Sequence, residues 1–286
     1  MRLHDYLERV GLQGPLGADL DALRRLHVAH REAFLFENIS IQTGSAVSMR
    51  LEDIERKFLD DGRGGYCFEQ NTLFAAALRD VGFDTTALLG RVRRGPPERW
   101  CRTHMVLRVM IGGNPWLADV GFGGIGLLEP MPLREGASAR QVGLSYSLRR
   151  ERDLWVLSCA GSEPAAEPSA SLDLYEFSED AQTPGDVEVA NHYTATHPDS
   201  VFRRTVTIQR TTRAERTILR HDAFRRYVDG RIEDRTIDST ELRAIAREVF
   251  GVALPDGPLV HEAFQAEGMA SLSNHAALTG WTTTAT

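Results

Sequence analysis

Three residues have the side chains of a thiol nucleophile and the pair that would activate it: Cys67, His104 and Asp119. A thiolate attacks carbonyl carbons, an imidazole takes up the thiol proton, and a carboxylate orients the imidazole. The cysteine closely follows the pair Gly64-Gly65, which permits a sharp turn of the backbone. The pattern indicates covalent catalysis through a cysteine. Each of the three residues also has an ordinary structural explanation, and spacing alone does not decide between the two.

The segment 67–81 has the periodicity of an amphipathic helix, and Gly82 follows it as a stop signal. Cys67 is therefore expected in the first helical turn, where unpaired N–H groups and the positive end of the helix dipole favour a thiolate. A protonated His104 nearby would lower the thiol pKa further. The same N–H groups could hold an oxyanion formed by attack on a carbonyl. The sequence thus predicts a thiol with a lowered pKa at a helix start.

The histidine and the aspartate are expected on a hairpin. The segment 104–111 reads as a strand, and 116–122 can be the return strand after a turn of glycine, asparagine and proline. Residues equidistant from the turn of an antiparallel hairpin face each other on one side of the sheet. A turn centred between positions 111 and 112 would therefore set the imidazole of His104 against the carboxylate of Asp119.

Motifs spread through the chain resemble those of the arylamine N-acetyltransferase family. They are Phe36-Glu37-Asn38, Arg63-Gly64-Gly65-Tyr66-Cys67-Phe68-Glu69, Thr103-His104-Met105, Asp119-Val120-Gly121-Phe122-Gly123-Gly124, Tyr175-Glu176-Phe177 and the stretch from Asn191 to Phe202. They follow one another in the family's order, and the glycine–cysteine block is the most specific of them. Only Leu35, which stands where many members have proline, departs from the pattern near these motifs.

The resemblance implies a Cys67–His104–Asp119 triad and acetyl-coenzyme A as co-substrate, with no tightly bound cofactor. An acetyl group would pass to Cys67 as a thioester and then to an arylamine, hydrazine or arylhydroxylamine in a ping-pong reaction. The resemblance also implies further site residues. They are Phe68 for the oxyanion hole through its backbone N–H, Thr103, Gly121, Phe122, Gly123 and Gly124 for the coenzyme, and Phe36 and Phe202 for the acceptor pocket.

The expected fold is of the α+β class. Patterning predicts helices near 3–11, 18–32, 50–60, 67–81 and 239–251, and strands near 85–92, 104–111, 116–122, 153–159, 187–195 and 201–210. This matches the three parts of the resembled family: a helical bundle over 1–83 carrying the nucleophile, a β-barrel over 84–210 carrying the histidine and aspartate, and an α/β lid with a tail over 211–286. A polar loop is expected over 161–170, and a loosely held end from Gln265.

Composition limits the partners and the compartment. The 286 residues include 42% hydrophobic and 26% charged residues and have a net charge of −7. These values are typical of a soluble globular protein and argue against nucleic acid or an anionic membrane as partner. No signal peptide or membrane span is recognised, and three scattered cysteines fit a reducing compartment, so a cytoplasmic protein is expected. The oligomeric state stays open, a homo-oligomer included.

Two other patterns resemble known binding motifs but lack the context that those motifs need. The glycines of 121–126 have dinucleotide-binding spacing but no βαβ context, so they are interpreted as a loop that could touch the coenzyme's phosphates through backbone N–H groups. Cys101 and His104 have no partner pair at zinc-like spacing, so no metal is expected.

Two functions remain as alternatives to the acetyltransferase. They are an amide synthase that closes a polyketide onto its own aryl amine, and a transglutaminase- or protease-like thiol hydrolase.

Overall fold

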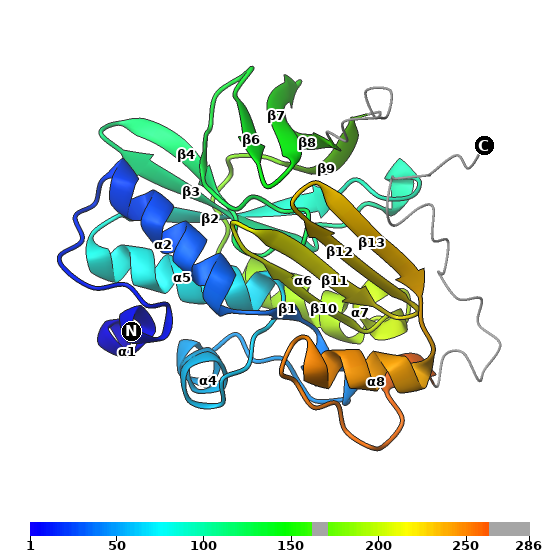
Figure 1. Cartoon of the computed structure of the whole chain (residues 1–286). Helices are drawn as coiled ribbons and strands as arrows, with labels where there is room; N and C mark the ends of the chain where they lie inside the picture. The colour runs from blue at the N-terminus through cyan, green and yellow to red at the C-terminus, as the bar shows by residue number, and fades with distance from the viewer. Residues whose placement is uncertain (162–170, 263–286) are drawn as a thin grey trace.

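The computed structural model describes residues 1–161 and 171–262. Residues 162–170 of the predicted loop lie outside this range, and so does the predicted loosely held end from Gln265. The helices are α1 Leu3–Arg9, α2 Leu20–Ala33, α3 Ile39–Gln42, α4 Leu51–Glu55 with a π-helical continuation Arg56–Asp60, α5 Cys67–Val81, a short 3-10 turn Pro97–Arg99, α6 Pro184–Thr196, α7 Val201–Arg204 and α8 Ser239–Glu248. Two antiparallel sheets complete a mixed fold (Figure 1).

The larger sheet has eight strands in the order β5-β4-β3-β2-β9-β8-β7-β6. The strands are β2 Asp84–Val92, β3 His104–Ile111, β4 Asn114–Ala118, β5 Met131–Pro132, β6 Ser138–Gln141, β7 Leu144–Glu151, β8 Leu154–Gly161 and β9 Leu172–Phe177. The edge strands β5 and β6 are not hydrogen-bonded to each other, so the sheet resembles a barrel that is nearly but not fully closed. It corresponds to the predicted β-barrel.

The smaller sheet has the order β1-β10-β11-β12-β13. Its strands are β1 Phe36–Glu37, β10 Thr207–Thr211, β11 Glu215–Arg220, β12 Ala223–Val228 and β13 Arg231–Thr236, and α8 packs beside β11. We call this sheet with α8 the lid, after the predicted α/β lid. Strand β1 lies within the predicted helical region, and β10 crosses the predicted boundary at residue 210. The division of the chain into three parts itself stays a prediction.

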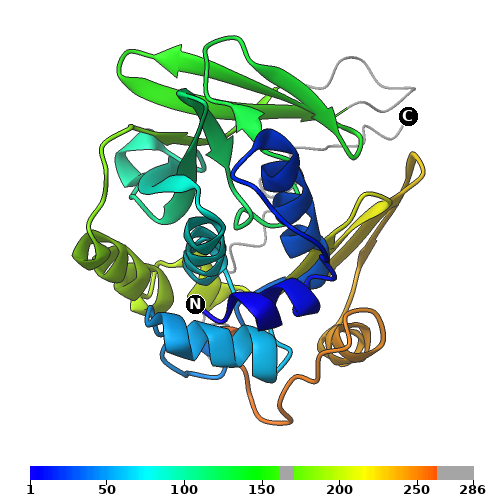
Figure 2. The ribbon, with the colours of Figure 1, turned by 90° about the vertical axis from the view of Figure 1, so that its left-hand side faces the viewer.

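Helices α2 and α5 support the strands that carry the predicted histidine and aspartate. Asp19 caps α2 by accepting from the N–H of Ala22, and Gly82 ends α5 in the left-handed conformation with φ of 108°. The bounds of α5 agree with the predicted helix over 67–81. Its apolar face packs on β2 and β3 and forms the main hydrophobic core with α2 (Figure 2).

The predicted strand over 187–195 is wrong, because this segment belongs to helix α6. Its start has a capping box: Thr183 and Asp186 exchange hydrogen bonds around Pro184, which occupies the first turn. These are strong start signals that outweigh the β-branched residues inside the segment. The predicted strand over 201–210 is also wrong in its first half, which forms α7 before β10 begins.

Strands β6, β7 and β9 were not among the predicted strands. Part of β9 is the Tyr175-Glu176-Phe177 motif, whose residues are buried between neighbouring strands. Within the described part of the chain, no helix combines the length and the apolar character needed to cross a membrane.

Candidate active site

Cys67 begins helix α5 and is 2% exposed. The approach to it is fixed by Gly64 and Gly65, which lie beside β1: the N–H of Gly65 donates to the carbonyl of Leu35. A Cβ on Gly64 would lie 1.9 Å from the carbonyl oxygen of Leu35. Neither glycine has a positive φ. Gly64 is therefore required by the close approach of two backbone segments, and Gly65 by the side chain of Glu69, whose Oε2 would lie 2.4 Å from an added Cβ. The sharp turn that the sequence suggested is not the reason for either glycine.

The thiol of Cys67 lies among backbone groups. Its Sγ is 3.7 Å from the carbonyl oxygen of Thr103, to which it can donate. Burial raises the pKa of the Cys67 thiol, and the charge of Asp119 acts in the same direction. The backbone N–H groups of Met105 and Phe68 favour the thiolate, as expected at a helix start, but burial outweighs them. The expected lowered pKa is therefore wrong for this structure, so a nearby base has to remove the thiol proton.

His104 and Asp119 meet, but in a different register from the predicted one. The hairpin pairs Leu107 with Ala118, whereas the predicted turn would pair it with Trp116, two positions earlier. Strand β4 ends at Ala118, and the chain then turns so that the Asp119 carboxylate reaches back toward the imidazole. The Nε2 of His104 lies 2.8 Å from the Oδ2 of Asp119, and the two residues are 2% and 0% exposed. The predicted contact is present because the strand stops early.

Both carboxylate oxygens of Asp119 accept hydrogen bonds. In addition to the His104 bond, its Oδ1 accepts from the N–H of Gly121 at 2.9 Å and from the Nδ2 of Asn71 at 3.2 Å. Burial acts to raise the pKa of Asp119, but the His104 charge and these hydrogen bonds outweigh it and lower the pKa to about 2. Asp119 is thus a carboxylate at neutral pH, with its orientation set from three sides.

Helix α2 holds the segment after β4 from the other side. The Nε2 of His27 accepts the N–H of Asp119 at 3.1 Å, and its Nδ1 lies 2.8 Å from the carbonyl of Leu128. The guanidinium of Arg31 donates to the carbonyls of Val120 and Gly123, at 3.1 and 2.6 Å. Neither His27 nor Arg31 is predicted from the sequence. The sequence signal that could have indicated them is their spacing of four residues, which places both polar side chains on the same side of the helix. An amphipathic helix buries one side, so two polar residues there would need partners.

His30 fixes the start of α5 through a chain of hydrogen bonds. Its Nε2 lies 2.7 Å from the Oε1 of Gln70, whose Nε2 donates to the carbonyls of Leu35 and Gly65. Its Nδ1 lies 2.9 Å from the hydroxyl of Tyr6. Because the amide of Gln70 uses its donors on carbonyls, the imidazole donates from Nε2 and accepts from the hydroxyl. A neutral His30 therefore holds, through Gln70, the segment of Gly64 and Gly65 before Cys67.

Two aromatic rings enclose the imidazole of His104. Phe122 meets it edge-on with ring centroids 5.0 Å apart, and Tyr175 lies at 4.8 Å. The Tyr175 hydroxyl is buried and acts electrostatically on Asp119, yet it forms no hydrogen bond of good geometry. The rings exclude water from one side of the imidazole, so Phe122 adjoins the base as well as the predicted coenzyme loop.

The glycine loop after Asp119 uses its N–H groups within the protein. Those of Gly121, Gly124 and Gly126 donate to Asp119, to Gln209 of the lid at 2.5 Å, and to the carbonyl of Gly123. These three N–H groups already have acceptors and are not available to phosphates. Contact of the rest of this loop, including the N–H groups of Phe122 and Gly123, with the coenzyme stays a prediction.

The two predicted acceptor-pocket residues lie together. The rings of Phe36 and Phe202 have centroids 6.1 Å apart, and Phe202 also meets Tyr66 at 5.3 Å. Tyr66 immediately precedes Cys67, and its hydroxyl hydrogen-bonds to the side chain of Asn191 in α6. Phe36 is buried whereas Phe202 is partly exposed, so an aromatic wall extends outward from the neighbourhood of the thiol.

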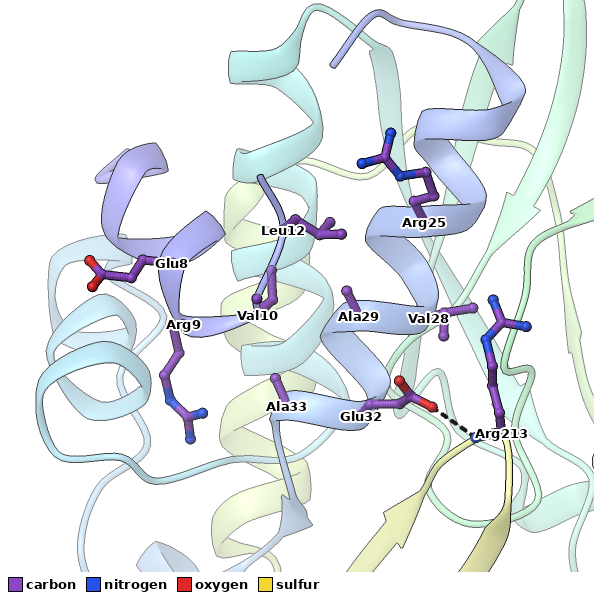
Figure 3. A pocket seen from close by; sticks show the side chains of 11 residues that line it. Glu8, Arg9, Val10, Leu12, Arg25, Val28, Ala29, Glu32, Ala33 and Arg213 are labelled. Carbon is purple, nitrogen blue, oxygen red and sulfur yellow. Dashed lines mark hydrogen bonds between the residues drawn. The ribbon is translucent and has the colours of Figure 1, made fainter. Parts of the chain in front are cut away.

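A surface groove of about 510 Å³ lies elsewhere, along α2 and the end of α1 (Figure 3). It is lined by Glu8, Arg9, Val10, Gly11, Leu12, Arg25, Val28, Ala29, Glu32, Ala33 and Arg213. None of the predicted site residues lines it. Among the described residues, no group of three or more His, Cys, Asp or Glu side chains is arranged to hold a metal ion.

Comparison with known proteins first defines the class of protein. A family model described as N-acetyltransferase matches residues 19–259. The arylamine N-acetyltransferase of Escherichia coli is 32% identical over 258 residues, covering 89% of this chain and 90% of that protein. The enzyme of Mycolicibacterium smegmatis is 34% identical, covering 90% and 94%. The chain is an acyltransferase, and it belongs to the arylamine N-acetyltransferase family.

Solved structures agree with this assignment. The arylamine N-acetyltransferase of Mycobacterium abscessus matches with a TM-score of 0.82 at 31% identity, covering 90% of this chain and 91% of that one. The Mycobacterium marinum enzyme, solved in complex with CoA, matches with a TM-score of 0.79 at 30% identity, covering 87% and 92%. The resemblance stated from the sequence motifs is confirmed.

Proposed function

We propose that this enzyme transfers an acetyl group from acetyl-coenzyme A, through a thioester on Cys67, to arylamines, hydrazines or arylhydroxylamines. The observation that carries the proposal is the buried His104–Asp119 hydrogen bond together with a buried thiol whose Sγ lies 3.7 Å from the carbonyl oxygen of Thr103, the residue before His104. Family membership, and the CoA bound to the Mycobacterium marinum relative, support the choice of donor. Acetyl-coenzyme A acts here as a co-substrate.

In the first half-reaction, His104 takes the thiol proton while the sulfur of Cys67 attacks the acetyl carbonyl carbon. The backbone N–H groups of Phe68 and Met105 are near the sulfur, and we assign Phe68 to the oxyanion hole. The bond between the acetyl carbon and the coenzyme sulfur breaks, and the imidazolium returns its proton to the departing thiolate. Asp119 keeps the imidazole oriented and stabilises its charged form.

In the second half-reaction, the amine nitrogen attacks the thioester and His104 removes a proton from it. The acetyl–sulfur bond breaks, and Cys67 recovers its proton from the imidazolium. We assign Phe36 and Phe202 to the pocket of the aromatic acceptor, and Thr103 with Gly121, Phe122, Gly123 and Gly124 to the coenzyme side. The carbonyl of Thr103 is already beside the thiol, and Phe122 adjoins the base.

Initial-rate kinetics test this proposal. With acetyl-coenzyme A and an arylamine both varied, a double displacement gives parallel double-reciprocal lines, and coenzyme A is released in a stoichiometric burst when no amine is present. Steady release of acetate without amine would instead favour a thiol hydrolase. Absence of any reaction with acetyl-coenzyme A would overturn the proposed donor.

A further inference from the structure

Lys57 is the only lysine in the chain, and the other residues among its 33 lysines and arginines are all arginine. It lies in the π-helical segment Arg56–Asp60, and its side chain is 16% exposed. Its Nζ lies 2.7 Å from the Oε1 of Glu69 and 3.9 Å from the Oε1 of Glu37. A π-helical turn is rare and often occurs at a functional site. Lys57 is thus placed between two buried carboxylates.

Glu69 connects this lysine to the nucleophile. It is 3% exposed and lies in the first turn of α5, two residues after Cys67. Its Oε2 accepts the N–H of Tyr66, the residue directly before Cys67, at 3.2 Å. This bond satisfies one of the free N–H groups at the helix start. Because both of its oxygens accept hydrogen bonds, from Tyr66 and from Lys57, Glu69 is a carboxylate.

The ion pair belongs to a cluster of two carboxylates and two cations. Glu37 in strand β1 accepts from the Nε and Nη2 of Arg63 at 3.1 and 2.7 Å, and its other oxygen accepts the N–H of Ile39. The side chains of Glu37 and Glu69 are 0% and 4% exposed. With Lys57 the four charges sum to zero. Without it, two buried carboxylates would share one cation, close to the start of α5.

An uncompensated charge on Glu69 would act against a thiolate at Cys67. The start of a helix is positively polarised and stabilises an anion in its first turn. The carboxylate and the thiolate occupy the same turn, so they share this field and repel each other, and burial leaves their repulsion little screened. Burial is the main cause that raises the pKa of the Cys67 thiol, and the charges of Asp119 and Glu69 add to it. The ammonium of Lys57 opposes the contribution of Glu69.

The other titratable groups at the thiol belong to the machinery already described. His104 follows Thr103, whose carbonyl lies next to the thiol, and it binds Asp119. Tyr66 is neutral, because burial raises the pKa of its hydroxyl. Glu69 is therefore the charge near the thiol for which the mechanism gives no use, and Lys57 is its cationic partner.

We propose that Lys57 is a positioning residue of the transfer reaction: by neutralising Glu69, it allows the thiolate of Cys67 to form at the start of α5. The proposal deepens the proposed function and rests on it. A compact ammonium with three donors suits a place between two carboxylates, whereas a planar guanidinium suits one carboxylate held by two parallel bonds, as Arg63 holds Glu37. This difference accounts for a lysine at this position in a chain that otherwise uses arginine.

The test is the pH dependence of two reactions of the thiol in the full chain: alkylation by iodoacetamide, which needs no acyl donor, and acylation by acetyl-coenzyme A. Peptide mass spectrometry separates Cys67 from the exposed Cys101, which is the internal reference. In Lys57→Met the midpoint of both profiles for Cys67 should move to higher pH by at least about 0.5 pH unit, because the charge of Glu69 is no longer neutralised. An unchanged midpoint would overturn the proposal.

Two further variants distinguish charge from structure. Lys57→Arg keeps the positive charge, and the surface hollow of about 330 Å³ that Lys57 borders has room for the longer side chain, so its midpoint should not move. Lys57→Met combined with Glu69→Gln removes both charges and keeps an acceptor for the N–H of Tyr66. Its midpoint should return to within about 0.2 pH unit of that of the unmodified protein. Should Lys57→Met not fold, Lys57→Gln carries the same test.

The possible failures can be told apart. A purely structural role of Lys57 would lower the rate at every pH without moving the midpoint, or would leave the double variant at the midpoint of Lys57→Met; either result overturns the proposal. If acetyl-coenzyme A does not acylate the unmodified protein, the proposed function fails, and the alkylation profiles still decide whether Lys57 acts on the thiol. If acylation occurs and neither profile moves, the proposed function stands and the role of Lys57 is refuted.

Discussion

Gly121 lies directly against the backbone of Cys67: a Cβ at position 121 would be 2.8 Å from the Cα of Cys67 and 3.0 Å from its carbonyl oxygen. It would also lie 2.5 Å from the Nδ2 of Asn71, the donor to Asp119. The absence of a side chain at Gly121 therefore allows the segment that carries the aspartate to pack on the helix that carries the nucleophile.

Gly121→Ala is expected to lower kcat by at least about tenfold and to destabilise the protein by about 1–3 kcal/mol, because the new methyl group pushes this segment away from α5. Gly257→Ala is the control, since a Cβ there meets nothing within 4 Å and φ is not in the left-handed region. Stopped-flow release of coenzyme A and thermal unfolding measure the two effects. Full activity in Gly121→Ala would show that this contact does not position Asp119.

Asp119→Asn should reduce the rate of Cys67 acylation by about 10³- to 10⁴-fold, because the amide no longer orients His104 or stabilises its charged form. The measurement is the burst rate of coenzyme A release, with circular dichroism recorded on the same sample. Should Asp119→Asn not fold, His104→Gln carries the same test. A folded variant of either residue with nearly normal burst rate would contradict the roles proposed for them.

Phe202→Ala is expected to act on the second half-reaction alone. Loss of one aromatic contact should raise KM for a two-ring arylamine about 3- to 10-fold, corresponding to about 0.5–1.5 kcal/mol. Acylation by acetyl-coenzyme A should not change. Phe202→Leu keeps an apolar side chain, so its KM for this arylamine should lie between those of the unmodified protein and Phe202→Ala. A loss of acylation rate with unchanged KM for the amine would exclude Phe202 from the acceptor pocket.

The free energy of unfolding should fall as the pH is lowered from about 6.5 to about 4. Burial lowers the pKa of His27 to about 4, of His30 to about 3 and of His261 to about 4. In this range the unfolded chain binds protons that the folded chain does not, so each histidine removes up to about 1.4 kcal/mol per pH unit. Asp119, with its pKa lowered to about 2, adds acid sensitivity only below about pH 4.

Urea unfolding at several pH values between 7 and 4.5 measures this dependence. His30→Gln keeps a polar group next to Gln70 and Tyr6 and should reduce the slope, since one of the three titrating residues is removed. The exposed His4→Gln is the control and should leave the slope unchanged. A flat profile in the unmodified protein would contradict the neutral state assigned to the buried histidines.

The sequence was sufficient for the elements whose local signals agree with their surroundings. Helix α5 was predicted with its observed bounds, because its apolar periodicity and Gly82 act together. The strands β2 and β3 follow from their alternation. The helix over 184–196 was missed because its β-branched residues were weighed above the capping residues Thr183 and Asp186. A start signal of this kind decides the conformation of a segment whose composition is ambiguous.

Only those residues of the candidate site that belong to recognisable sequence motifs could be predicted. The meeting of His104 with Asp119 was predicted, but not the register that achieves it, since the early end of β4 depends on contacts from α2 and α5. His27 and Arg31 reach the aspartate segment from about 90 residues earlier in the chain, at 3.1 Å in both cases. Such long-range relationships leave no local pattern to read.

The intact mass of the protein after incubation with acetyl-coenzyme A alone tests the central claim most directly. The account predicts the addition of one acetyl group, its absence in Cys67→Ala, and its loss from the protein when an arylamine or hydrazine is added. Addition of the group to Cys67→Ala, or an acetyl group that no amine removes, would contradict transfer through a Cys67 thioester.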